Sequence, residues 1–177
     1  WPPSTNVIPG EPAIFVITAS NYYRVAAVFT NGANIGVPFN NNSTNYTFIW
    51  TNMLVAGGTV DVAFVAQITT NAPAQVPYEW LGSYFVTNDY NAAANADQDL
   101  DGQTAWQEYI AGTIPNNATS CFKAAQNTRN TITWSPVSGR VYSVYWSTNL
   151  VKGITNMIKD GIMYPTNNYT NATPDGR

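Results

Sequence analysis

The feature that most constrains this chain is a group of acidic residues with a fixed spacing. Four of its ten acidic residues fall in the stretch DQDLDGQTAWQE, which begins at residue 97. Aspartate occupies the first, third and fifth positions, glycine the sixth and glutamate the twelfth. This spacing is typical of a loop whose alternate side chains point inward toward one hard cation. It predicts a Ca²⁺ site formed by the carboxylates of Asp97, Asp99, Asp101 and Glu108 and the backbone carbonyl of Gln103.

We expect this ion to stabilise the fold rather than to take part in catalysis, because the loop itself supplies the ligands and leaves no spare base. The ninth position is Ala105, so water would provide the ligand there. The alternative is a solvated acidic turn that precedes a helix. Three clustered aspartates with no basic residue nearby in the sequence would repel one another in such a turn, which favours the cation.

Most of the remaining chain has the composition of short strands separated by turns. β-Branched and aromatic residues predict strands, and Gly and Asn clusters such as Asn31-Gly32 predict the turns between them. The predicted strands are 13–19, 23–29, 45–51, 60–68, 131–137 and 140–148. The last two are expected to form a hairpin at Ser138-Gly139. Helical spacing of apolar residues predicts helices at 77–85 and 104–112, whereas the tail from Val151 to Arg177 has only weak strand signals.

These elements predict a mainly β fold: two small antiparallel domains, a β-repeat and a β-sandwich, joined by a short helical, EF-hand-like calcium connector. The expected divisions are an extended segment at 1–11, a β-repeat domain at 12–70, the calcium connector at 77–115 and a β-sandwich-like domain at 119–177. The chain begins at Trp1 rather than Met, so we interpret it as a mature or trimmed product.

Composition argues against several classes of function. The chain has no histidine, which excludes a Ser-His-Asp triad and a His-ligated zinc site, and its single cysteine excludes an internal disulfide. Seven basic residues in a chain of net charge −3 predict no nucleic-acid partner, and no apolar run is long enough for a membrane helix. Outside the acidic loop no motif marks a catalytic carboxylate pair, so we expect no enzymatic activity, and a hydrolase is the remote alternative.

The flanks of the loop resemble known families. The segment from Trp80 to Ser120, with its aromatic helix, Ala-rich spacer, acidic loop and "EYIAGT-P" ending, resembles a dockerin-like or thrombospondin-type-3-like calcium segment. That segment is found in secreted proteins of the Verrucomicrobia, Lentisphaerae and Kiritimatiella kind, and residues 132–150 look like the β-sandwich that accompanies it. Residues 10–70 are similar to an internalin-type B-repeat of bacterial surface proteins. The resemblance implies a secreted bacterial protein associated with the cell surface.

Two departures from these families predict self-assembly. The repeat usually opens with a strand where this chain has only "WPPST", and the sandwich usually closes with a strand beyond "YTNATPDGR". A β domain that lacks an outer strand exposes unpaired backbone groups, which a neighbouring copy can fill. We therefore expect a calcium-stabilised, non-enzymatic structural protein that forms a head-to-tail homopolymer, a surface fibre or filament, by strand exchange. The proline-rich segment Trp1–Glu11 is the expected donor. The alternatives are that these family strands are simply absent from this protein, or that the chain is a fragment of a longer surface protein.

Two further expectations concern sugars. The alternative function is a carbohydrate-binding or adhesive module of a larger secreted protein, since six tryptophans and eleven tyrosines can supply stacking surfaces. Glycans on the protein itself would help to keep a chain with only 10% charged residues in solution. The Asn-x-Ser/Thr acceptor pattern occurs at Asn41, Asn42, Asn45, Asn117, Asn168 and Asn171.

Overall fold

The structure is a computed structural model, and it describes residues 10–36, 45–51, 58–128, 130–147, 149, 151, 153–154 and 156–171. Of the described residues, 39% are in strands and 13% in helices, and all strand pairs among them are antiparallel. The prediction of a mainly β, antiparallel chain is therefore confirmed. None of the described helices is long and apolar enough to cross a membrane.

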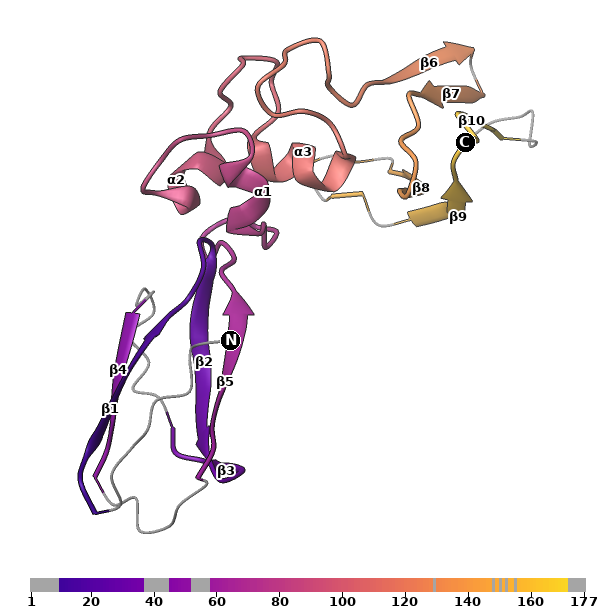
Figure 1. The fold of residues 1–177 in the computed structure, drawn as a ribbon. Helices are drawn as coiled ribbons and strands as arrows, with labels where there is room; N and C mark the ends of the chain where they lie inside the picture. The colour runs from indigo at the N-terminus through magenta and orange to yellow at the C-terminus, as the bar shows by residue number, and fades with distance from the viewer. Residues whose placement is uncertain are drawn as a thin grey trace. The chain divides into compact units, whose positions relative to one another are not determined.

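The chain divides into two compact units, whose elements Figure 1 labels. The first unit consists of Trp1–Thr70 and Pro77–Ser83, and the second of Asn71–Val76 and Tyr84–Arg177. The segment predicted as a calcium connector, 77–115, thus contributes its first residues to one unit and the rest to the other. The predicted domain boundaries remain predictions.

The first unit contains two small sheets. β1 (Ala13–Thr18) pairs with β4 (Asn45–Trp50), while β2 (Tyr23–Thr30) lies between β3 (Ala33–Asn34) and β5 (Val60–Ala66).

Local sequence explains how these strands meet. Asn31 and Gly32 both adopt positive φ, 50° and 78°, which is the backbone that a two-residue hairpin between β2 and β3 requires. The predicted turn is therefore present. Phe15 lies opposite Phe48 across the β1–β4 ladder, with ring centroids 6.0 Å apart, and Val28 of β2 is fully buried. These contacts give the unit its apolar interior.

The short helix α1 (Tyr78–Gly82) packs against the start of β2. Leu81 is fully buried, and Gly82 lies so close to the Tyr22 ring that any side chain at position 82 would collide with it. The predicted helix at 77–85 is present in shortened form, and its close approach to Tyr22 depends on glycine.

The described residues of the second unit form two helices, α2 (Tyr90–Asn95) and α3 (Ala105–Ala111), followed by five strands (Figure 1). The strands are β6 (Ala124–Thr128), β7 (Thr131–Trp134), β8 (Val141–Trp146), β9 (Asn156–Met163) and β10 (Asn168–Thr170). They form a three-stranded sheet of order β10-β7-β6 and a two-stranded β8–β9 ribbon. The buried residues Trp134, Val144 and Ile162, one from each of β7, β8 and β9, form its core.

The predicted hairpin at Ser138-Gly139 is wrong. The turn exists, since Arg140 N donates to Val137 O at 3.2 Å, but β7 pairs with β6 and β10 while β8 pairs with β9. The backbone N–H of Val137 donates to the Tyr142 hydroxyl at 2.7 Å and therefore takes part in no ladder between the two strands. The turn instead links two layers, across which the Trp134 and Tyr142 rings lie 5.7 Å apart.

Other parts of the second unit differ from the sequence prediction as well. The tail contains two definite strands, β9 and β10, in place of weak signals, and β9 carries an irregular register around Gly161, which has a φ of 68°. Helix α2 was not predicted as a helix, although its Asp89 cap accepts a hydrogen bond from Ala92 N at 2.9 Å. Helix α3 falls inside the predicted 104–112 range and ends at Gly112, which has a φ of 79°.

Candidate metal centre

The acidic loop connects α2 to α3 in the second unit. Its turn is made by two residues with positive φ, Leu100 at 63° and Gly102 at 96°. Leucine rarely adopts this conformation, and its side chain is 84% exposed, so packing of Leu100 does not explain the strain. Such strain in a loop that concentrates acidic side chains is typical of a functional site.

The loop brings the three predicted aspartate ligands together. Asp97, Asp99 and Asp101 each offer a carboxylate oxygen, and these oxygens lie within 4.8 Å of one another. The backbone holds this arrangement: Asp97 Oδ2 accepts from Gly102 N at 2.9 Å, and Asp101 Oδ1 accepts from Gln103 N at 2.8 Å. The cluster can therefore hold a metal ion.

Two carboxylate oxygens in the cluster are buried without a partner. The Oδ1 atoms of Asp99 and Asp101 accept backbone hydrogen bonds, whereas their Oδ2 atoms are bonded to none of the described residues. A buried carboxylate oxygen without a donor costs at least about 1–3 kcal/mol. A divalent cation would satisfy both atoms at once, so the residues present fit a cation site.

Glu108, the predicted twelfth-position ligand, is on α3 and is only 1% exposed. Its Oε1 accepts a hydrogen bond from Thr113 Oγ1 at 3.1 Å, and Glu108 is not one of the three grouped carboxylates. Burial raises the pKa of this carboxyl to about 7; the Thr113 hydrogen bond lowers it, and the negative charges of the three aspartates raise it. A cation nearby would reverse the effect of those charges.

Gln103 has a second role that the sequence did not reveal. Its backbone carbonyl was predicted as a ligand, but its side chain also binds the backbone of Phe122, which lies just before β6. Gln103 Nε2 donates to Phe122 O at 2.7 Å, and Phe122 N donates to Gln103 Oε1 at 3.4 Å. The acidic loop is thereby attached to the start of the sheet.

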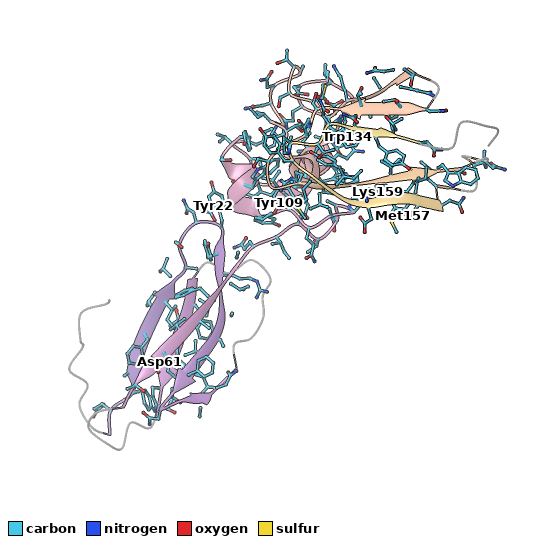
Figure 2. All side chains as sticks on the ribbon, turned by 90° about the vertical axis from the view of Figure 1, so that its right-hand side faces the viewer. Tyr22, Asp61, Tyr109, Trp134, Met157 and Lys159 are labelled. Carbon is cyan, nitrogen blue, oxygen red and sulfur yellow. The ribbon has the colours of Figure 1, made fainter. Side chains whose placement is uncertain are left out.

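Helix α3 is held at both ends. At its start, Gln107 Oε1 accepts hydrogen bonds from Thr104 N at 2.8 Å and from Thr104 Oγ1 at 3.1 Å. At its end, Arg140 Nη2 donates to the carbonyl of Tyr109 at 2.7 Å, and the guanidinium lies beside Gly112. Figure 2 shows Tyr109 on this helix. A cation at a helix C-terminus also interacts favourably with the helix dipole.

The predicted glycosylation sites are scattered. Asn117, Asn168 and Asn171 are exposed, and Asn117 Oδ1 accepts from the hydroxyl of Thr119, the third residue of its own acceptor pattern, at 2.8 Å. Asn41 and Asn42 lie outside the described residues, and Asn45 begins β4. Modification of these residues remains a prediction.

Comparison with known proteins leaves the family of the chain open. The chain matches no protein-family model, no curated protein sequence and no solved structure. The resemblance to dockerin-like segments and internalin-type repeats therefore remains a prediction that rests on the residues quoted above.

Proposed function

We propose that this chain is a calcium-stabilised, non-enzymatic structural module of an extracellular assembly. The observation that carries the calcium proposal is the pair of buried, unpartnered oxygens, Asp99 Oδ2 and Asp101 Oδ2, inside a loop with the calcium spacing. Carboxylate and carbonyl oxygens are ligands of hard cations, and a site whose ligand oxygens are spread along a loop suits Ca²⁺ better than the smaller Mg²⁺.

A structural role follows from what the loop connects. Its second half begins α3, its Gln103 side chain binds Phe122, and the end of α3 binds Arg140 at the turn before β8. An ion that fixes the loop therefore also fixes where α3 and the strands begin. This arrangement supports stabilisation of the second unit rather than chemistry on a substrate.

The test is thermal unfolding of the full chain in excess Ca²⁺, excess Mg²⁺ and a chelator. Ligand that binds only the folded state at a hundredfold excess over Kd adds about 2.7 kcal/mol to the free energy of unfolding. We expect Ca²⁺ to raise Tm by that mechanism in the wild type and in Asp61→Asn, a control on β5 that Figure 2 labels. Asp99→Asn and Glu108→Gln should lose the effect. An equal Tm with and without Ca²⁺ would contradict the proposal.

The assembly part of the proposal is supported by the β8–β9 ribbon. Within the described ranges neither outer edge of this ribbon pairs with another strand. Its surface carries large apolar side chains, among them Met157 and Met163, which are 56% and 63% exposed. A two-stranded ribbon is marginal in water, and an open, apolar edge invites another strand.

We propose that copies of the chain join head to tail by adding a strand at such an edge, as part of a fibre or filament at the cell surface. The contact is heterologous, because the donated segment and the receiving edge are different parts of the chain, and such contacts can propagate. Residues 1–9 of the expected donor, Trp1–Glu11, lie outside the described residues. The donor role is tested by removing residues 1–11, which should abolish assembly.

A further inference from the structure

The second unit contains a pocket of about 390 Å³ beside the acidic loop. It is bounded by the outer face of α3, the segment before β6 and the start of β8. This volume is near the lower end of the range of small-molecule sites, so it suits a single ring rather than a long ligand.

Aromatic rings form the walls of the pocket. Trp106 of α3, Phe122 and Tyr142 of β8 all line it and are half-buried. Phe122 and Tyr142 are stacked, with centroids 5.7 Å apart and planes inclined by 11°. Phe122 is fixed through its backbone by Gln103, and the Tyr142 hydroxyl accepts from Val137 N. The aromatic wall is therefore ordered before any ligand enters, which reduces the entropy lost on binding.

The polar groups of the pocket are donors. Among the described residues, Arg140 is the one cation that lines it, and no acidic residue does. The guanidinium is oriented by the bond from its Nη2 to Tyr109 O, and its buried Nε has no hydrogen-bond partner among the described residues. Gln107 uses its Oε1 to cap α3, so its amide Nε2 remains available as a donor. A ligand that matches this pocket has an apolar ring face and negatively charged acceptor oxygens.

We propose that this pocket binds an acidic sugar, a hexuronic acid residue of an anionic polysaccharide. The C–H face of a pyranose ring packs on aromatic side chains, its hydroxyls accept from an amide, and its carboxylate pairs with guanidinium. A neutral sugar has no carboxylate to pair with Arg140. A carboxylate without a ring has no apolar face to pack on the aromatic wall. The inference is independent of strand exchange and goes beyond the structural role proposed above.

The test is a ¹H–¹⁵N chemical-shift titration of the full chain in Ca²⁺, which observes the indole N–H of Trp106 and the Nε–H of Arg140. The probes are methyl β-D-glucuronide, its neutral match methyl β-D-glucoside, and acetate. We expect saturable shifts confined to the pocket with the glucuronide, and binding at least about tenfold weaker with the glucoside, because a hydrogen bond to a charged group contributes about 1.5–3 kcal/mol.

Gln107→Glu is the decisive variant. Glutamate retains an acceptor oxygen for the cap on Thr104 but replaces the amide donor with a negative charge inside the pocket. Glucuronide binding should fall at least tenfold while Tm is retained, whereas the same substitution at exposed Gln126 of β6 should change neither. Arg140→Gln should also abolish the preference for glucuronide over glucoside.

Four outcomes would overturn the inference. Equal affinity for glucuronide and glucoside would remove the charge argument, and equal affinity for acetate would remove the ring argument and indicate an acidic-peptide site instead. Shifts that map outside the pocket, or no saturable shift with the glucuronide, would show that the pocket does not bind an acidic sugar.

Discussion

The side-chain amide of Gln103 makes two hydrogen bonds to the backbone of Phe122: it donates to the carbonyl at 2.7 Å and accepts from the N–H at 3.4 Å. The residues are 19 positions apart, and the first belongs to the acidic loop while the second packs against the core of the second unit. This link gives any ion in the loop a direct mechanical connection to the sheet.

The substitution Gln103→Leu separates the effect of this link on stability from the effect of the calcium ligands. The backbone carbonyl of residue 103 is retained, but the bond to Phe122 is lost, which should lower the free energy of unfolding by about 1 kcal/mol. Calcium affinity, measured by isothermal titration, should change far less than in Glu108→Gln. If both variants lose calcium affinity equally, the Gln103 side chain acts on the ion rather than on the sheet.

The raised pKa of Glu108 predicts an unusual pH dependence in chelator. The pKa of Glu108 in the folded chain, about 7, lies above its usual value of 4.5. The protonated carboxyl therefore makes its full contribution to the free energy of unfolding below about pH 4.5. This contribution is lost as the pH rises through about 7. Urea unfolding of the chelated protein should therefore show stability decreasing over this range.

Calcium should reverse the slope, because the ion binds the ionised carboxylate and so adds stability as the pH rises. Glu108→Gln should remove the decrease that Glu108 contributes in chelator. A chelated wild type and a Glu108→Gln variant with the same pH profile would show that Glu108 titrates normally.

The assembly proposal predicts that charge on β9 dissolves the fibre. Met157 lies on this strand with Lys159, as Figure 2 shows, and Met157→Lys combined with Met163→Lys should leave monomers in sedimentation velocity and electron micrographs. Val86→Lys, at a fully exposed apolar residue between α1 and α2, is the matched control and should assemble. Monomers in the wild type, or fibres in the double variant, would show that this edge does not mediate assembly.

Gly82→Ala should destabilise the first unit, because the new methyl group collides with the Tyr22 ring. Overpacking of this kind costs about 1–3 kcal/mol, measurable in urea. The double variant Tyr22→Ala/Gly82→Ala removes the collision, so adding Gly82→Ala to Tyr22→Ala should cost much less. Neither change should alter calcium affinity, since the collision lies in the first unit and the acidic loop in the second.

The acidic loop was predictable because its chemistry is local. Oxygen ligands for one ion must recur at fixed positions of a short turn, so the grouping of Asp97, Asp99 and Asp101 can be read from their spacing alone. Helix α3 was predictable for the same reason, since its apolar spacing and its end at Gly112 lie within one short segment.

The separate strand partners of β7 and β8 were not predictable from local sequence. A tight turn between two strand-like segments predicts a hairpin, but the partners of β7 include β10, whose Thr170 lies 39 positions beyond Thr131 in a segment rich in Asn and Thr. The side-chain role of Gln103 was hidden likewise, because its partner Phe122 is distant in sequence. Helix α2 did carry a signal, an Asp cap followed by alanines, that could have been used.

The turn at Ser138-Gly139 links two layers instead of closing a hairpin. This affects the order in which the second unit can fold. Trp134 N donates to Asn167 O at 2.9 Å, so the sheet closes only after the ribosome has released the residues of β10. Bringing two such distant segments together carries a loop-closure entropy that slows folding, whereas the acidic loop is complete within twelve residues. We therefore expect the cation site to form among the first structures of this unit, and the far edge of the sheet among the last.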